Sequence, residues 1–249
     1  MTEAELAAAT SLLVKAWQTG ERLDALNATP ANLAEAHAIQ DRVAAALNEP
    51  VGGFKAALQK EGPILRGLIL GRVIFASPAR IPAALVPGLD VEGEIAFRFT
   101  RDLPPRDTDY TREEVADSVT AMPAIEVVSS RMKDRRTRPM LEQVADFAGS
   151  GALVSGPALP DWQALDIKNL PVTLWINDEV AFEGQGGHPT GDPLGVAVAL
   201  ANTFRHENGV KSGQLVTTGN CAVMRTLQPG DRFAVEFKGL GRAELVFVP

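Results

Sequence analysis

The amino-acid sequence predicts an α+β protein in which a short helical part precedes a β-rich core. Residues 1–50 carry an Ala- and Leu-rich helical pattern, whereas residues 51–249 contain short β-like runs separated by Gly and Pro. These runs do not alternate regularly with helices, which argues against a doubly wound parallel sheet. A chain of 249 residues is long enough for one large hydrophobic core. We therefore expect a helical N-terminal part, residues 1–50, and one core, residues 51–249.

Two helices are predicted in the N-terminal part. Thr2 and Glu5 have the spacing of a capping box at the start of the first helix. The second begins at Thr29-Pro30, places apolar residues along one face and ends at Asn48-Glu49-Pro50.

The core is predicted to contain strands, two helices and a C-terminal hairpin. Strand-like runs cover residues 68–76, 91–99, 124–129, 172–176 and 215–218. One helix begins at a capping box of Thr111 and Glu114, and another runs from Asp192-Pro193 to Asn208-Gly209. Residues 233–237 and 245–247 alternate apolar with polar side chains on either side of a glycine-containing turn, which predicts the hairpin.

Composition excludes several classes of partner and location. A net charge of -7 argues against nucleic-acid binding, and no run approaches the roughly 18 apolar residues of a membrane span. Cys221 is the single cysteine, so no intrachain disulfide can form. The N-terminus lacks the pattern of a secretory signal. We expect a soluble cytoplasmic protein that binds neither nucleic acid nor membrane.

Basic residues cluster between residues 131 and 138, where five of the eight side chains are Arg or Lys. The simplest interpretation is a solvated loop. A basic side chain beside an anionic small molecule is the alternative, which the cluster alone does not decide.

The segment Val91–Phe99 predicts a pair of neighbouring carboxylates. Its odd positions are Val, Gly, Ile, Phe and Phe, so Glu92 and Glu94 project together from the other face. Neighbouring like charges repel unless a cation lies between them. For a Glu-x-Glu pattern alone, a solvent-exposed polar face would be the better explanation.

Glu126 strengthens the case for a metal site because it stands alone in an apolar run, Met122–Val128. A charge buried there requires a partner. Three carboxylates without nearby Cys or His form an all-oxygen ligand set, which suits Mg²⁺ or Mn²⁺ better than zinc or copper. The three histidines, His37, His188 and His206, lack metal-ligand spacing.

Lys55 lies in a glycine-led apolar segment, Gly52–Leu58. Near a metal, a buried lysine could balance substrate charge or exchange a proton. A lysine whose stem packs while its ammonium group reaches water is an equally good interpretation.

Several motifs together resemble a known family. They occur, in order, at residues 53–55, 91–97, 101–104, 123–131, 144–146, 187–189 and 229–231. Over nearly the whole chain the sequence resembles the 2-keto-4-pentenoate hydratases and the related 4-oxalocrotonate decarboxylases of the fumarylacetoacetate hydrolase superfamily. The resemblance implies a mixed β-roll core of the fumarylacetoacetate hydrolase C-terminal type with a small helical N-terminal part, assembled as a homo-oligomer.

The same resemblance implies roles for particular residues. The family's metal ligands fall on Glu92, Glu94 and Glu126, which would hold Mg²⁺ (or Mn²⁺), and its active-site lysine falls on Lys55. The backbone around Ile95, together with Asp146 and Ser150, falls on substrate-binding positions. The implied reaction is hydration of a 2-hydroxy-2,4-dienoate, a small 2-oxo acid of aromatic catabolism, to a 4-hydroxy-2-oxo acid through a metal-bound enolate.

Three departures from the family pattern leave other outcomes open. Family members usually carry an acidic residue within the segment that reads Leu68–Arg72 here, and an Asn and a Ser where this chain has Phe147 and Gly149. Asn220 stands where a serine is more usual. Decarboxylation of a vinylogous 2-oxo diacid, hydrolysis of an acylpyruvate and service as a non-catalytic partner subunit are therefore alternatives.

Overall fold

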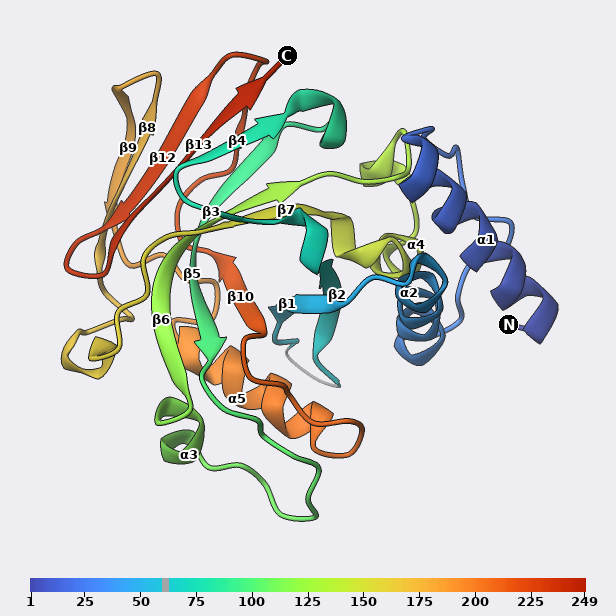
Figure 1. Cartoon of the computed structure of the whole chain (residues 1–249), viewed down its shortest axis with the longest axis horizontal. Helices are drawn as coiled ribbons and strands as arrows, with labels where there is room; N and C mark the ends of the chain where they lie inside the picture. Colours follow the sequence, from blue (N-terminus) through green and yellow to red (C-terminus); the bar gives the residue numbers. More distant parts are fainter. Residues whose placement is uncertain (60–62) are drawn as a thin grey trace.

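The structure, a computed structural model, describes residues 1–59 and 63–249 and contains two β-sheets with helices around them (Figure 1). The α-helices are α1 (Glu3–Thr19), α2 (Leu33–Leu47), α3 (Arg112–Ala116), α4 (Met140–Ala145) and α5 (Pro193–Phe204). Short 3₁₀ helices are η1 (Gly71–Val73), η2 (Ala83–Leu85), η3 (Arg135–Thr137), η4 (Phe147–Gly149) and η5 (Trp162–Ala164). The prediction of an α+β fold is confirmed.

The larger sheet carries the candidate site. Its strands run in the order β2-β1-β10-β5-β6-β7-β3, and β11 pairs with β5 beside this path. Their bounds are β1 (Val51–Ala57), β2 (Leu65–Leu70), β3 (Ile74–Ala76), β5 (Asp90–Phe99), β6 (Val119–Val128), β7 (Ser150–Ser155), β10 (Leu215–Asn220) and β11 (Arg225–Thr226). The long antiparallel pair of β5 and β6 forms the centre of the sheet, with β10 and β1 on one side and β7 on the other.

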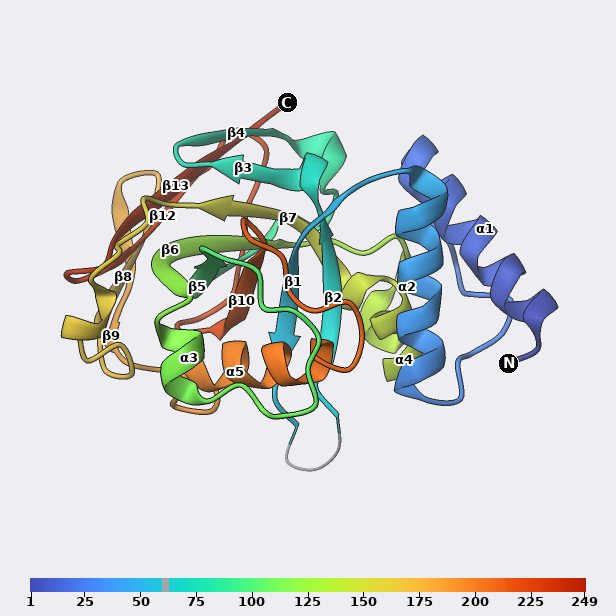
Figure 2. The ribbon, with the colours of Figure 1, turned by 60° about the horizontal axis from the view of Figure 1, so that its bottom comes forward.

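The smaller sheet has the order β4-β13-β12-β8-β9. Its strands are β4 (Ala79–Pro82), β8 (Pro171–Ile176), β9 (Glu179–Gln185), β12 (Arg232–Phe237) and β13 (Gly241–Val248). Strands β12 and β13 pair antiparallel from Phe237 opposite Gly241 to Arg232 opposite Val246, which confirms the predicted C-terminal hairpin. Figures 1 and 2 show this sheet at the opposite end of the molecule from α1.

The two sheets pack together through one face of β5. A side chain at Gly93 would meet Val235 of β12 at 2.9 Å and Leu174 of β8 at 3.2 Å, so the backbone of β5 approaches the smaller sheet closely there. Side chains alternate along a strand, so Glu92 and Glu94 point to the opposite face. The close packing at Gly93 therefore fixes which face carries the carboxylates.

The carboxylate face is covered from the side of the N-terminal helices. Gly67 of β2 is the cross-strand partner of Lys55, so both positions share a face. A side chain at Gly67 would lie 2.2 Å from the Phe147 carbonyl oxygen, which shows that η4 lies directly on this face. Helix α2 packs in turn against α4 and β2.

The N-terminal helices differ in part from the prediction. The capping box of Thr2 and Glu5 is present and α1 ends at Gly20, but residues 20–32 are not helical. The predicted start of α2 at Thr29-Pro30 is wrong, because Asn32 caps a helix that begins at Leu33. The Thr29 hydroxyl instead donates to Glu142 at 2.6 Å.

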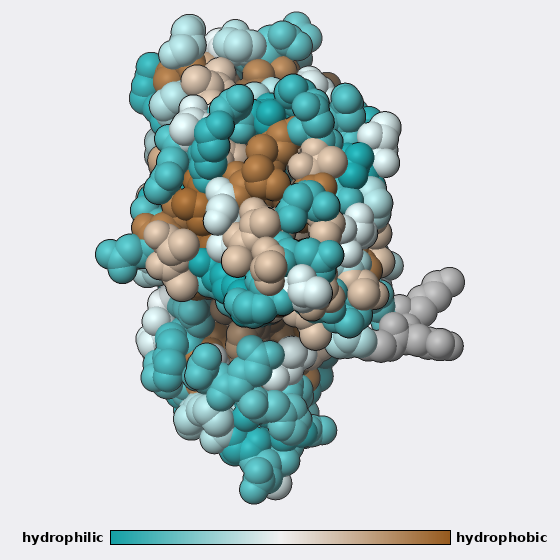
Figure 3. Space-filling view, turned by 90° about the vertical axis from the view of Figure 1, so that its right-hand side faces the viewer, coloured by the Kyte–Doolittle hydropathy of each residue, from teal (hydrophilic) through white to brown (hydrophobic). Residues whose placement is uncertain are grey.

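Figure 3 shows apolar surface among hydrophilic side chains on the face of the molecule that α1 occupies.

Other predicted boundaries also shift. The run at residues 68–76 is not one strand, because η1 separates β2 from β3. Strand β6 begins at Val119, five residues before the predicted start, and α5 ends at Phe204 rather than at Asn208-Gly209. Among the described residues, no helix combines the length and apolar character needed to cross a bilayer.

Candidate metal centre and active site

Three glutamates from two neighbouring strands converge on the carboxylate face. Glu92 of β5 lies directly opposite Glu126 of β6 in the antiparallel register, and Glu94 follows two residues further along β5. One carboxylate oxygen from each of the three side chains lies within 4.8 Å of the other two. The convergence expected from the sequence is thus present, and the oxygens are close enough to hold one metal ion.

Burial makes this cluster electrostatically unusual. Glu126 is 0% and Glu94 1% exposed. Burial, followed by the charge of Glu126, raises the pKa of Glu94 well above its usual range, and burial also raises the pKa of Glu92. Both shifts arise because ionised carboxylates lose hydration and repel one another. A cation between them would remove both penalties.

Lys55 reaches the cluster from β1. Lys55 pairs with Thr217 of β10, which pairs with Ala96 of β5, so the lysine shares the face of the glutamates. Its Nζ lies 2.6 Å from Glu126 Oε1 and 3.8 Å from Glu92 Oε2. Burial disfavours its charge, but the carboxylates outweigh burial and raise the pKa of Lys55 above its usual value. One ammonium group thus faces three carboxylates.

An irregularity in β10 adds backbone contacts that the sequence analysis missed. The register with β5 shifts between Thr217 and Asn220, and Gly219 adopts a φ of 119°, a conformation that favours glycine. The Gly219 N–H consequently donates to Glu94 Oε2 at 2.9 Å, and the Thr217 hydroxyl donates to Glu126 Oε2 at 3.4 Å. The Thr-Thr-Gly sequence was the available signal, but the bulge depends on pairing with β5.

His188 holds the same irregular segment from the other side. Its Nε2 lies 2.7 Å from the Thr218 carbonyl oxygen, which can only accept, so Nε2 carries the proton. Burial lowers the pKa of His188, in keeping with a neutral ring. The Thr218 hydroxyl donates to the Ile95 carbonyl at 2.7 Å. These contacts anchor the backbone next to Gly219.

Cys221 lies close to the glutamates without being a nucleophile. Burial, with the charge of Glu94, raises the pKa of its thiol to about 12. The thiol therefore stays protonated at neutral pH, and the nucleophilic thiolate does not form.

The residues predicted to bind substrate are placed differently from one another. Ile95 is buried, and its side chain alternates with Glu94 onto the face toward the smaller sheet. Ser150 is the first residue of β7 and pairs with Val128 of β6. Val128 lies two residues after Glu126 on the same strand. Asp146 is fully buried and accepts hydrogen bonds from Ser130 Oγ at 2.5 Å and from Arg131 N at 2.9 Å and Nε at 2.5 Å. These bonds give Asp146 a structural role, and contact of Ile95, Asp146 and Ser150 with substrate stays a prediction.

Interpretation of the basic cluster as a solvated loop is wrong for Arg131. Its side chain is buried, is paired with Asp146 at 2.5 Å and donates to the Ser150 carbonyl at 2.7 Å. Its guanidinium also lies over the Trp17 ring, 4.4 Å from the centroid. Lys133 and Arg136, by contrast, are exposed.

The segment that lacks an acidic residue forms β2 and η1. Leu68, Ile69 and Leu70 are buried, and Arg72 pairs with Glu49 at 3.3 Å. The segment therefore contains no carboxylate that could act as an acid or base.

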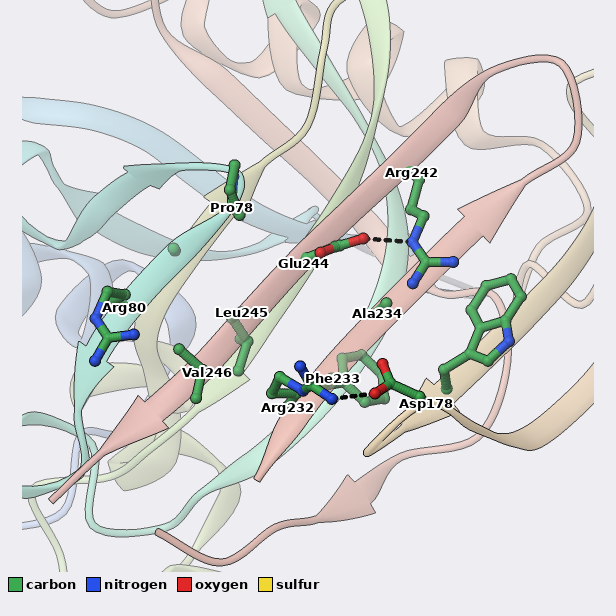
Figure 4. A pocket seen from close by; sticks show the side chains of 12 residues that line it. Pro78, Arg80, Asp178, Arg232, Phe233, Ala234, Arg242, Glu244, Leu245 and Val246 are labelled. Atoms are coloured by element: carbon green, nitrogen blue, oxygen red, sulfur yellow. Dashed lines mark hydrogen bonds and ion pairs between the residues drawn. The ribbon is translucent and has the colours of Figure 1, made fainter. Parts of the chain in front are cut away.

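A separate recess of about 300 Å³ lies on the smaller sheet (Figure 4). Arg232 pairs with Asp178, Arg242 pairs with Glu244 at 2.6 Å, and Arg242 also stacks 4.3 Å from the Trp175 ring centroid. These charges are already balanced by neighbours. We therefore place the candidate active site at the three glutamates.

The fold and the site define the class of protein. The chain belongs to the fumarylacetoacetate (FAA) hydrolase family, whose C-terminal domain matches residues 67–248. The predicted family and fold type are confirmed. Within the family, the chain is 32% identical over 184 residues to the 2-keto-4-pentenoate hydratase of Paraburkholderia xenovorans (strain LB400). That alignment covers 73% of this chain and 67% of the relative.

Two further similarities involve decarboxylases. The chain is 29% identical over 128 residues to a 4-oxalocrotonate decarboxylase of Pseudomonas putida, covering 51% of this chain and 48% of that protein. A solved 4-oxalocrotonate decarboxylase from Pseudomonas putida G7 superposes with a TM-score of 0.85 at 19% identity, over 100% of this chain and 99% of the other. The prediction of an enzyme akin to these hydratases and decarboxylases is confirmed.

Proposed function

We propose that the protein is a divalent-metal-dependent lyase that hydrates a 2-hydroxy-2,4-dienoate to a 4-hydroxy-2-oxo acid, with Mg²⁺ as its metal. The observation that carries this proposal is the convergence of Glu92, Glu94 and Glu126 beside Lys55. The alignment with the hydratase of Paraburkholderia xenovorans supports hydration. The solved decarboxylase that shares the fold is complexed with magnesium and adipate, which supports the choice of metal.

The donor set fits a hard divalent cation. Three ionised carboxylates and one ammonium group leave a net charge of about −2 in a mostly buried site. All the donors are oxygens, which Mg²⁺ and Mn²⁺ prefer. When bound, the metal would supply Lewis-acid polarisation of a 2-oxo carboxylate and so favour enolisation.

The chain's own residues would orient the ligands and hold a proton. Hydrogen bonds from Gly219 N–H and Thr217 Oγ1 fix the Glu94 and Glu126 carboxylates. Lys55, held against Glu126, keeps a protonated amine beside the position of the substrate oxygens. The ammonium group can stabilise developing negative charge there or return a proton to carbon.

Decarboxylation is the second candidate, and one observation favours it. Water addition needs a group that activates or delivers water. The segment Leu68–Arg72, where family members usually carry an acid, is apolar apart from an Arg72 that pairs with Glu49. Loss of carbon dioxide from a vinylogous 2-oxo diacid would use the same enolate stabilisation without that group.

Ultraviolet spectroscopy with product analysis tests the proposal. The protein with Mg²⁺ should bleach the absorbance of 2-hydroxypenta-2,4-dienoate faster than buffer does and yield the 4-hydroxy-2-oxo acid. Glu92→Gln should lose this activity, whereas Glu179→Gln, an exposed glutamate on β9 of the other sheet, should keep it. Release of carbon dioxide from a 2-oxo diacid would select the second candidate. No turnover of either substrate would contradict both.

Assembly as a homo-oligomer and a cytoplasmic location stay predictions. Sedimentation equilibrium of the purified chain measures the first, because an oligomer has a multiple of the 26.5 kDa chain mass. Fractionation of the producing cells measures the second.

A further inference from the structure

A recess of about 260 Å³ adjoins the carboxylate face of the larger sheet. Its lining includes Asp90 and Val128, which pair across β5 and β6 as Glu92 pairs with Glu126. Residues two apart on a strand share a face, so the recess begins about 7 Å along the strands from the Glu92–Glu126 pair. The recess therefore opens beside the candidate metal centre.

Two cations approach the glutamates from opposite ends of β5. Lys55 comes from the Ala96 end, through the pairing of β1, β10 and β5, and its Nζ lies 2.6 Å from Glu126 Oε1. Arg135 of η3 lines the recess at the other end of β5, where Asp90 lies. A ligand bound over the glutamates would therefore lie between the two cations.

Arg135 lies near the glutamates without pairing with any of them. Its guanidinium packs on Gly149, where an added side chain would lie 2.7 Å from its Nε. One N–H donates weakly to the Ala148 carbonyl at 3.4 Å, and Nε has no hydrogen-bond partner among the described residues. Within residues 1–59 and 63–249, no carboxylate lies within ion-pair distance of Arg135. Burial, the largest influence on the pKa of Glu92, raises it, whereas the charge of Arg135 lowers it, as expected of a nearby cation.

The other cations of the recess are engaged. Lys133 pairs with Asp24 at 3.0 Å, and Arg136 lies 3.8 Å from Asp90. Arg22 donates to two backbone carbonyl groups at 2.6 and 2.8 Å. Among the described residues of the recess, Arg135 is therefore the cation that remains available to a ligand.

The charge of the site calls for one more cation when an anionic ligand binds. Three ionised glutamates and Lys55 carry a net charge of about −2, which a divalent cation would neutralise. A 2-oxo acid at that cation would bring one further negative charge into a mostly buried site, where an unpaired charge is costly. The guanidinium of Arg135 can neutralise it.

Resting on the proposed function, we infer that Arg135 binds the single carboxylate of the 2-hydroxy-2,4-dienoate at the metal centre and so sets the affinity for substrate. The guanidinium fork matches a carboxylate in geometry and charge. Arginine keeps its proton at any working pH, so this side chain contributes charge and no proton transfer. Because the carboxylate stays ionised throughout the reaction, Arg135→Gln should raise KM and leave kcat within about threefold of the parent value.

Calorimetric titration with Mg²⁺ and with pyruvate, a three-carbon 2-oxo acid whose only charge is its carboxylate, tests this inference without turnover. At saturating Mg²⁺, Arg135→Gln should bind pyruvate at least about tenfold more weakly than the parent, since a charge-assisted hydrogen bond is worth about that much. Arg135→Lys, which keeps the charge but not the fork, should recover part of this loss. Without pyruvate, Arg135→Gln should bind Mg²⁺ at least as tightly as the parent, because a positive charge that repels the ion is removed. Opposite effects on the two ligands distinguish a binding role from a structural one.

Arg136→Gln is the matched control, because it removes the same charge from the same short helix at an exposed side chain. It should keep the affinity for pyruvate within about twofold. Unchanged pyruvate affinity in Arg135→Gln, a parallel loss of Mg²⁺ and pyruvate affinity, or an equal loss in Arg136→Gln would overturn the inference alone. No Mg²⁺-dependent binding of pyruvate to the parent would overturn the proposed function with it.

Discussion

Two buried ionic clusters lie on the same part of the larger sheet and differ in charge balance. In the first, Arg131 and Asp146 form a one-to-one pair in which both Asp146 oxygens accept hydrogen bonds and the guanidinium also reaches the Ser150 carbonyl. In the second, Lys55 is the one cation within ion-pair distance of the three glutamates among residues 1–59 and 63–249. Glu94 and Glu126 of the second cluster are buried, whereas the side chains of Glu92 and Lys55 are 19% and 20% exposed, so solvent relieves the charge imbalance only in part.

The difference separates a structural cluster from a binding site. A balanced, fully hydrogen-bonded pair stabilises one backbone arrangement, here the junction of β6, α4 and β7. An excess of carboxylates raises the pKa values of Glu92 and Glu94 and destabilises the metal-free state. A bound cation that neutralises the excess negative charge explains such a cluster. The following substitutions test this division.

Removing one partner of the balanced pair should produce the largest effect on stability. Asp146→Ala leaves Arg131 buried without a counter-charge, so we expect a loss of about 3–5 kcal/mol in the free energy of unfolding. Denaturant titration measures it. Glu21→Ala, which removes an exposed partner of Lys15, should change stability little. Equal effects of the two substitutions would contradict a structural role for Asp146.

Removing one charge from the unbalanced cluster should lower metal affinity rather than stability. Glu94→Gln is expected to weaken Mg²⁺ binding by about 100-fold, roughly 2.7 kcal/mol, because one of three anionic ligands is lost. The metal-free variant should be at least as stable as the parent, since repulsion with Glu126 is removed. Calorimetric titration and denaturation measure the two effects, with Glu179→Gln as the unchanged control. If Glu94→Gln were less stable than the parent but bound Mg²⁺ with unchanged affinity, Glu94 would have a structural role and would not bind the metal.

Local patterns were enough to predict the metal cluster. Alternation along β5 placed Glu92 and Glu94 on one face, and an isolated charge in an apolar run marked Glu126. Capping boxes at Thr2 and Thr111 fixed two helix starts, because a cap depends only on neighbouring residues. The three side chains come together because β5 pairs with β6. The local patterns did not predict this pairing, and the family resemblance was needed to group the three glutamates as ligands of one metal.

Features that depend on long-range packing were not predictable in the same way. Nothing near Arg131 in sequence distinguishes it from exposed Lys133, and its burial depends on Trp17 and Asp146. The start of α2 was misplaced because Thr29 bonds to Glu142, more than a hundred residues away. The Gly219 N–H aimed at Glu94 requires a bulge whose position is set by the partner strand.

The pH dependence of metal stabilisation offers a smaller test of the unbalanced cluster. Because the folded-state pKa values of Glu92 and Glu94 exceed their ordinary 4.5, metal-free stability should fall as the pH rises above 4.5 through those values. Mg²⁺ must displace the retained protons, so its effect should grow with pH. At 100 times its Kd, Mg²⁺ should add about 2.7 kcal/mol at pH 8 and less at pH 5.5. Thermal unfolding with and without Mg²⁺ measures this; a larger shift at pH 5.5 would contradict it.

His37 provides the smallest test, at a buried group outside both clusters. Burial, with the nearby Arg66 charge, lowers the pKa of His37 to about 4, and its Nε2 accepts from the Arg66 N–H at 3.4 Å. The neutral ring therefore contributes stability above the ordinary value of 6.5 that is lost as the pH falls from 6.5 to 4.

His37→Gln removes this titration and should make the loss of stability between pH 7 and pH 4.5 smaller by about 1–2 kcal/mol, after allowance for partial exposure. Exposed His206→Gln is the matched control and should follow the parent. Comparing each variant with the parent by denaturation at each pH cancels the contribution of Glu92 and Glu94, which has the opposite sign. If His37→Gln and the parent lost stability in parallel, the pKa of His37 would be the same in the folded and the unfolded protein, and burial would not lower it.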